Sequence, residues 1–197
     1  TAGERLGQAW DALLLGTSQG QQRARELLEQ GVALDPEHPG VLAALSLAYV
    51  LGPGADPARA SGAVDLLQRA QELDGSDPGV LRAESGVALV NKAYIQANDR
   101  ARNCLKQLGG DGLCSWILGE ALLGLELYPD AVTVLLEAER ALPDAPAVLV
   151  ALSEGLLTTF QYALAREKIE ALTAKGDVSE GLWLRARLSR EIGAFDE

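Results

Sequence analysis

Few residues of this chain have the types and spacing that a catalytic or metal site needs. The 197-residue sequence contains one histidine and two cysteines. His38 closes the turn-forming run Asp35-Pro36-Glu37-His38, and no serine or cysteine stands near it at a recognisable motif spacing. We therefore interpret His38 as a solvated turn residue, and we expect no catalytic residue and no enzyme activity.

Cys104 and Cys114 are ten positions apart in the chain. A structural zinc site needs four ligands, so two cysteines and a distant histidine predict neither a metal nor a cofactor. A disulfide is within reach of this spacing. Cys104, however, falls at a small, inward-facing position of the helical pattern described below, and buried free thiols are our expectation.

A glycine-rich run, Gly109-Gly110-Asp111-Gly112, could offer backbone N–H groups to a phosphate. It lacks the Lys-Ser/Thr pair of a phosphate loop and lies between two apolar helical patterns, which is typical of a helix stop. The formal net charge of −11 and the absence of a long Lys/Arg run exclude a nucleic-acid partner. The apolar runs are far shorter than the roughly 20 residues that span a bilayer, so we expect no membrane-spanning segment.

The elements that carry these residues repeat along the chain. An interval of 34 residues separates Tyr94, Tyr128 and Tyr162, and it also separates Ala63, Ala97, Ala131 and Ala165. A second marker, PGVL or PAVL, begins at Pro39, Pro78 and Pro146, and its first interval is 39 residues. We place the five extra residues in the breaker-rich stretch Gly52-Pro53-Gly54-Ala55-Asp56-Pro57. A fixed period of this length is typical of solenoid proteins.

Within each unit the apolar residues recur at the helical period, so each unit is expected to form a helical hairpin. Proline at the first position of a helix is tolerated because its missing N–H would have no partner there. The expected helices span 4–16 and 20–34, 39–51 and 58–74, 78–91 and 94–107, 112–125 and 128–141, 146–158 and 162–174, and a lone helix at 179–192.

These residues resemble the tetratricopeptide repeat (TPR) family, and the unit at 112–145 matches it best. The signature positions of that unit hold Leu118, Gly119, Leu122, Tyr128, Ala131, Leu135, Ala138 and Pro143. Small residues stand where the two helices of a unit should touch, at Ser46, Ser85, Gly119 and Ser153. The glycine that the family places between its helices is often absent, and units 1 and 3 match least well.

The resemblance implies an all-α fold, a right-handed superhelical solenoid of antiparallel helix pairs with about five and a half repeats. We expect one domain over 1–197, with units at roughly 4–38, 39–77, 78–111, 112–145 and 146–178 and a partial unit at 179–197. The chain has no methionine and its last unit is incomplete, so we expect it to be a fragment of a longer protein.

In the family, the first helix of each unit lines a concave groove that holds a partner. The resemblance carries this role to Leu47, Val50, Leu51, Arg82, Leu89, Val90, Trp116, Glu120, Leu123, Val150, Glu154, Leu157, Trp183 and Arg187. Trp116 and Trp183 are either anchors for a partner or packing residues, and the sequence leaves both interpretations open. The Lys/Asn clamp with which some members grip a terminal carboxylate is missing.

The expected function is therefore a non-catalytic scaffold or adaptor that binds another protein or peptide through apolar anchors. Two alternatives stay open: a regulatory domain fused to a signalling enzyme, and a lipoprotein-like assembly factor of a bacterial envelope machine such as a pilus or secretion system. Self-association through the last helix is a further expectation. A cytoplasmic location is favoured, with a periplasmic or outer-membrane-attached one as the alternative.

Overall fold

The computed structural model describes residues 1–50, 57–143, 145–174 and 179–193, and the side chains of 57–61 and 179 are outside this description. All of the described secondary structure is helical. The eleven helices in that part of the chain are α1 (Ala2–Leu14), α2 (Ser18–Leu34), α3 (Pro39–Val50), α4 (Pro57–Asp74), α5 (Pro78–Val90), α6 (Tyr94–Leu108), α7 (Gly112–Gly124), α8 (Tyr128–Ala141), α9 (Pro146–Thr158), α10 (Tyr162–Thr173) and α11 (Ser179–Glu191).

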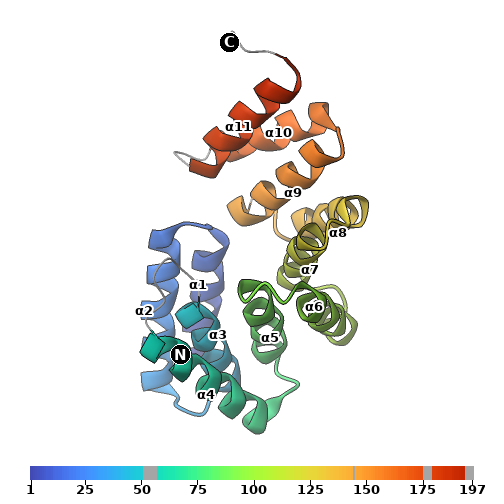
Figure 1. The fold of residues 1–197 in the computed structure, drawn as a ribbon. Helices are drawn as coiled ribbons and strands as arrows, with labels where there is room; N and C mark the ends of the chain where they lie inside the picture. Colours follow the sequence, from blue (N-terminus) through green and yellow to red (C-terminus); the bar gives the residue numbers. More distant parts are fainter. Residues whose placement is uncertain (51–56, 144, 175–178, 194–197) are drawn as a thin grey trace.

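Each odd-numbered helix packs against the even-numbered helix that follows it, and also against the next odd-numbered helix. We call α1, α3, α5, α7, α9 and α11 the first helices, and α2, α4, α6, α8 and α10 the second helices. The pairs stack into a curved array with α2, α6 and α8 on its outside (Figure 1). The all-α solenoid of helix pairs is therefore confirmed, with every expected helix end within two residues of the observed one.

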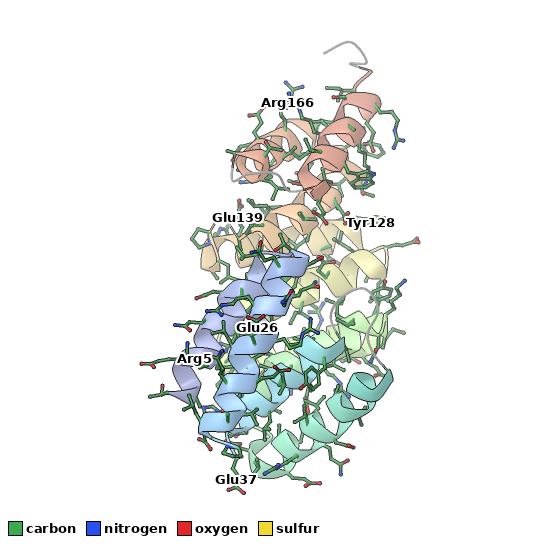
Figure 2. All side chains as sticks on the ribbon, turned by 90° about the vertical axis from the view of Figure 1, so that its left-hand side faces the viewer. Arg5, Glu26, Glu37, Tyr128, Glu139 and Arg166 are labelled. Atoms are coloured by element: carbon green, nitrogen blue, oxygen red, sulfur yellow. A yellow bond between two sulfur atoms is a disulfide. The ribbon has the colours of Figure 1, made fainter. Side chains whose placement is uncertain are left out.

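The repeated alanines mark the closest contacts of the second helices. Ala97, Ala131 and Ala165 are 0% exposed, and so are the residues seven positions later, Cys104, Ala138 and Leu172. Acidic and basic side chains occupy the opposite face of these helices and project from the surface, as Glu26 and Arg166 do in Figure 2. Buried residues of the core therefore recur at the same 34-residue interval as the sequence pattern.

Small residues set the distance between the two helices of a unit. A Cβ added to Gly119 would lie 2.4 Å from Cγ of Leu135 on α8. Ser46, Ser85 and Ser153, at the equivalent position of other units, are all 0% exposed. A larger side chain there would force the helices apart because the interior is already close-packed. The contact position predicted from the sequence is confirmed.

The turn between the helices of a unit keeps one backbone geometry even where glycine is absent. The fifteenth residue from the start of the first helix has positive φ in five units, at Gly16, Lys92, Glu126, Phe160 and Gly193. In the middle three units, paired hydrogen bonds such as Leu127 N to Leu122 O (2.9 Å) and Glu126 N to Leu123 O (3.0 Å) close a Schellman motif. Three non-glycine residues therefore hold a left-handed conformation that costs about 1 kcal/mol each.

Side-chain caps fix the starts of several helices. Thr1 and Glu4 form a capping box at α1, and Thr17 Oγ1 accepts from Gly20 N at α2 (3.0 Å). Asp77 caps α5, and Asp111 caps α7 by accepting from Cys114 N (3.0 Å). Within the described residues, no helix is long and apolar enough to cross a membrane.

Candidate partner-binding pocket

The concave side of the array carries one side chain from the same place in every first helix. The ninth residues of these helices form what we call the inner row: Trp10, Leu47, Gly86, Glu120, Glu154 and Arg187. Because the first helices stack side by side, this row runs along the inner wall from α1 to α11. Its first half is apolar and its second half is charged.

A cavity of about 310 Å³ opens on this wall. All six first helices contribute to its lining, together with Leu15 and Gly16 of the first turn and Gln21 of α2. The lining includes Leu47, Leu89, Val90, Trp116, Glu120 and Val150, all of them residues that the sequence assigns to the groove. The structure thus brings these six predicted residues together.

Contact between distant repeats narrows the groove into a pocket. Helix α1 contacts α9, and a Cβ placed on Gly16 would lie 3.8 Å from Cα of Ala147. Leu13 of α1 and Pro146 and Ala147 of α9 all line the cavity. The extended groove that the sequence suggests is therefore narrowed where the first repeat approaches the fifth.

Two tryptophans line the pocket from facing repeats. Trp10 is only 6% exposed, and its indole Nε1 is buried without a hydrogen-bond partner. Trp116 is half-buried, and its indole N–H is directed at the Glu120 carboxyl group, whose pKa it lowers. A buried N–H normally has an acceptor because leaving it unpaired costs about 1–3 kcal/mol. The Trp10 indole N–H is therefore a buried donor without an acceptor among the described residues.

Two carboxyl groups lie side by side on the charged half of the inner row. Burial, and after it the negative charge of Glu154, raise the pKa of Glu120 to about 7, and a hydrogen bond from the Trp116 indole opposes this rise in part. Burial also raises the pKa of Glu154, against the opposing effect of Arg187. No described residue forms an ion pair with Glu120. Negative charge at this site is therefore only partly compensated by the protein.

Arg187, the last member of the inner row, is held by its own surroundings. Its Nε donates to Glu191 Oε1 at 2.7 Å, and its Nη2 donates to Thr158 Oγ1 at 3.1 Å. Its guanidinium carbon also lies 5.8 Å from the ring centroid of Trp183, which is 54% exposed. These contacts fix the Arg187 charge near Glu154 rather than over Glu120.

Arg82 is likewise engaged within the protein. Its Nη2 lies 2.5 Å from Oδ2 of Asp111, with both side chains largely buried. Asp111 also caps α7, so the ion pair ties α5 to the start of the helix that carries Trp116. Arg82 therefore positions one wall of the pocket, and it does not line the cavity in this structure.

The other predicted groove residues fall into three settings. Leu157 is 0% exposed and belongs to the core, so it offers no surface to a partner. Val50 and Leu123 are half-buried between stacked first helices and do not line the cavity. Leu51 lies outside the described residues. Whether any of the groove residues binds a partner stays a prediction.

Trp10 and Leu13 are pocket residues that the sequence analysis missed. The first unit matches the repeat pattern poorly, so its groove positions could not be assigned by family signature. The signal was present in the hydrophobic pattern, because Trp10 follows the start of its helix by the same interval as Leu47 follows Pro39. The interval is seen only with the observed helix start at Ala2, because the sequence analysis began this helix at residue 4.

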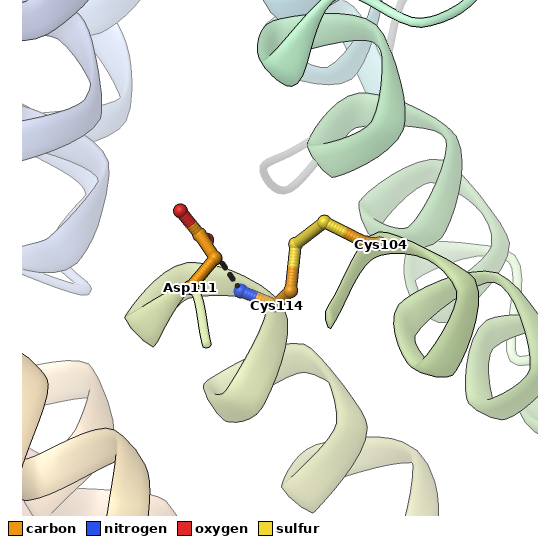
Figure 3. A group of neighbouring side chains, drawn as sticks. All are labelled: Cys104, Asp111 and Cys114. Carbon is orange, nitrogen blue, oxygen red and sulfur yellow. Dashed lines mark hydrogen bonds between the residues drawn. A yellow bond between two sulfur atoms is a disulfide. The ribbon is translucent and has the colours of Figure 1, made fainter. Parts of the chain in front are cut away.

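The cysteines are joined, contrary to our expectation of free thiols. Cys104 of α6 and Cys114 of α7 form a disulfide with a Cα–Cα distance of 6.2 Å, and both are 0% exposed (Figure 3). The helix stop at Gly109 turns the chain back so that the two helix ends meet. The Asp111 carboxylate lies within 4.8 Å of both sulfurs, but sulfurs bonded to each other are not metal ligands.

His38 also differs in part from expectation. His38 lies in the predicted turn, and its backbone N–H donates to the backbone carbonyl oxygen of Asp35 at 3.4 Å. Its Nδ1, however, is buried without a partner, so the imidazole is not fully solvated. The turn is confirmed, and the His38 side chain is partly rather than fully solvated.

Comparisons with known proteins support the fold. No family model and no curated protein matches the sequence. Among solved structures, Pseudomonas aeruginosa PilF is 20% identical with a TM-score of 0.66, over 99% of this chain and 87% of that one. The Thermus thermophilus TPR protein TTC0263 is 16% identical with a TM-score of 0.67, over 98% and 99% of the two chains. Yeast Tom70 is 13% identical with a TM-score of 0.63, over 90% of this chain and 38% of that one. The chain has the TPR fold.

Proposed function

We propose that this chain is a non-catalytic scaffold that holds a segment of a partner protein in the pocket of its concave face. The observation that carries the proposal is the pocket itself: a mainly apolar cavity of about 310 Å³ lined by Trp10, Trp116 and Glu120, where Glu120 has no ion-pair partner among the described residues. Binding energy concentrates where aromatic anchors and unsatisfied polar groups meet in a desolvated site.

The apolar lining favours a protein segment with bulky side chains over a highly charged ligand. Leu47, Leu89, Val90 and Val150 surround the tryptophans and would exclude water from an inserted side chain. The pocket is already formed without a ligand, so little ordering of the scaffold opposes binding. A rigid first-helix wall of this kind suits recognition rather than a chemical step.

The test is affinity capture from the native source with Trp116→Ala as the pocket variant. Ile95→Ala is the matched control, because Ile95 is 68% exposed on α6 and does not line the cavity. The proposal predicts that a partner recovered by wild type and by Ile95→Ala is lost with Trp116→Ala. Equal recovery by all three proteins would contradict the pocket as the binding site.

A second candidate function, an assembly factor of a bacterial envelope machine such as a pilus or secretion system, is favoured by the buried disulfide. Disulfides persist mainly in oxidising compartments, among them the bacterial periplasm. Thiol trapping with an alkylating agent in intact cells tests this candidate. Oxidised Cys104 and Cys114 would support it, and a fully reduced pair would contradict it.

A further inference from the structure

Glu120 is the only charged residue of α7, and its side chain lines the cavity of the concave face. It forms no ion pair with a described residue. The Trp116 indole donates one hydrogen bond to its carboxyl group, whereas an ionised carboxylate offers about four acceptor positions. Most of the hydrogen-bonding capacity of Glu120 therefore stays available within the cavity.

The charges around Glu120 leave this side of the cavity negative. Glu154 on α9 acts on Glu120 with its negative charge, and Glu180 of α11 also lines the cavity. The lining residues from α1, α3 and α5 are uncharged, and Arg82 of α5 is ion-paired outside the cavity. Arg187, whose charge acts on Glu154, is hydrogen-bonded to side chains of α11 and α9. The charges therefore favour a cationic ligand.

The lining favours an organic cation over a metal ion. Ca²⁺ and Mg²⁺ need several oxygen ligands that converge on one point. Within the described residues, three possible ligand residues converge only at Cys104, Asp111 and Cys114, which do not line this cavity. Trp10 and Trp116, in contrast, bring two indole rings to the lining, and indole is the side chain that attracts ammonium groups most strongly.

The rest of the cavity is mainly apolar. Leu47 of α3, Leu89 and Val90 of α5 and Val150 of α9 contribute to its lining. Its volume of about 310 Å³ lies within the range of small-molecule sites, about 300–1,000 Å³. Each methylene group that a ligand transfers from water into such a lining strengthens binding about fourfold. A ligand that uses the whole lining therefore carries a short apolar group together with its cation.

We propose that the cavity binds a small amphipathic amine, whose ammonium group pairs with the Glu120 carboxylate and whose apolar group contacts Leu47, Leu89 and Val90. This ligand goes beyond the proposed function, in which the same cavity holds a segment of a partner protein, and a bound amine would compete with that segment. Amine binding requires the cavity and its charges but no partner protein, so each of the two proposals can fail without the other.

The amine should displace a proton from Glu120. At pH 6.5 most Glu120 carboxyl groups are protonated, because their pKa is about 7, whereas an alkylamine is a cation at this pH. Pairing with the amine favours the ionised carboxylate, so binding releases a proton at pH 6.5 and becomes stronger as the pH rises from 5.5 to 8.

Isothermal titration calorimetry of the full chain tests the proposal with four probes: hexylamine, 1-hexanol, hexanoate and Nα-acetyl-lysine amide. Hexanol keeps the apolar group without a charge, hexanoate reverses the charge, and acetyl-lysine amide represents a lysine side chain of a protein. Each probe is titrated at pH 6.5 into wild type, Glu120→Gln and Glu137→Gln, in two buffers of different ionisation enthalpy that report released protons. Glu137 is exposed on α8 outside the cavity, so its variant removes the same charge from the general surface.

The proposal predicts that hexylamine binds wild type at least about tenfold more tightly than hexanol or hexanoate, with a proton release that Glu137→Gln retains. Glu120→Gln should bind hexylamine about tenfold more weakly than wild type and lose most of the proton release. It should bind hexanol as tightly as wild type does, which shows that its cavity is intact. Acetyl-lysine amide should bind at least about tenfold more weakly than hexylamine, because its amide groups lose hydration in an apolar site.

Equal affinities of hexylamine and hexanol would overturn the inference, since the cavity would then be apolar without a cation site. Equal losses with Glu120→Gln and Glu137→Gln would also overturn it and assign the attraction to the overall net charge of −11. Acetyl-lysine amide that binds as tightly as hexylamine would assign the site to a lysine of a partner protein instead. Absence of binding by all four probes overturns the inference as well, and the proposed function is then still tested by the capture experiment with Trp116→Ala.

Discussion

Glu120 and Glu154 occupy the same position of successive repeats, and the charge of Glu154 raises the pKa of Glu120. Burial acts in the same direction on both carboxyl groups. A protein selected only for stability would not keep two acids next to each other on a partly buried wall, because each disfavours ionisation of the other. Ionisation of the pair at neutral pH therefore lowers the stability of the folded chain.

The pair makes stability depend on pH in a defined window. The pKa of Glu120 is about 7 in the folded chain and 4.5 as its ordinary value, so the folded state binds more protons between these values. Stability therefore falls as pH rises from about 4.5 to 7, by as much as ~3 kcal/mol. Glu120→Gln should be as stable as wild type at pH 4.5 and more stable at pH 8, as measured by urea unfolding at both pH values.

Glu137→Gln is the control for this experiment, because Glu137 is exposed and its variant should follow wild type at each pH. A Glu120→Gln variant that shows the same difference from wild type at pH 4.5 and pH 8 would show that Glu120 does not titrate between them.

Replacing a non-glycine residue that has positive φ, such as Glu126, with glycine should increase stability. Glu126 has φ of 62° in the turn between α7 and α8, where glycine is the least strained residue. Glu126→Gly should raise the free energy of unfolding by about 0.5 kcal/mol, since the relief of strain exceeds the flexibility that glycine adds to the unfolded chain.

The reverse substitution at Gly109 tests the same principle. Its φ is 69° and a Cβ there would meet nothing within 4 Å, so only the backbone conformation opposes a side chain. Gly109→Ala should lower thermal stability, equivalent to about 1 kcal/mol. Opposite signs for the two variants are expected in calorimetry, and a shared sign would count against the turn geometry.

Close packing at Gly119 predicts a larger loss. The added methyl group of Gly119→Ala would overlap Leu135, so α7 and α8 must separate, at a cost of about 1–3 kcal/mol. Gly7→Ala is the matched control: Gly7 lies on the exposed face of α1, and a Cβ there meets nothing within 4 Å. Alanine should stabilise that helix by up to about 1 kcal/mol. Chemical denaturation of both variants compares the two effects directly.

The disulfide should contribute to stability by limiting the unfolded chain. Closing the short loop between Cys104 and Cys114 is worth roughly 2–3 kcal/mol in the chain-entropy description. A Cys104→Ser/Cys114→Ser variant should therefore unfold at a lower temperature than wild type, and a reducing agent should leave its melting temperature unchanged. Because both sulfurs are buried, wild type should react with the reductant mainly on unfolding. Equal melting temperatures of variant and oxidised wild type would contradict this contribution.

The periodic features of the fold could be predicted from the sequence because each depends on a local rule. Small residues recur at a fixed interval, as from Ala97 to Ala131, because they are buried where helices touch. Pro78 marks the start of α5 because proline is tolerated at the first position of a helix. Six residues assigned to the groove, Trp116 and Glu120 among them, lie on the wall of one cavity, and their role in binding stays a prediction.

The features that were missed depend on contacts between distant repeats. The approach of Gly16 to Ala147, which narrows the groove, results from small rotations summed over several repeats, and no local pattern encodes it. Leu157 has the same residue type and register as Leu89, yet it is buried by its neighbours. The state of the cysteines depended on whether a glycine stop would bring two helix ends together, which spacing alone did not decide.

Photo-crosslinking in the native source tests the central claim most directly. A benzophenone amino acid is placed at Val150, which lines the pocket, or at Ile95, which is exposed on α6 outside it. The account predicts that the Val150 probe crosslinks to one partner protein, and that the Ile95 probe does not capture this partner. Capture of the same partner by the Ile95 probe alone would contradict it.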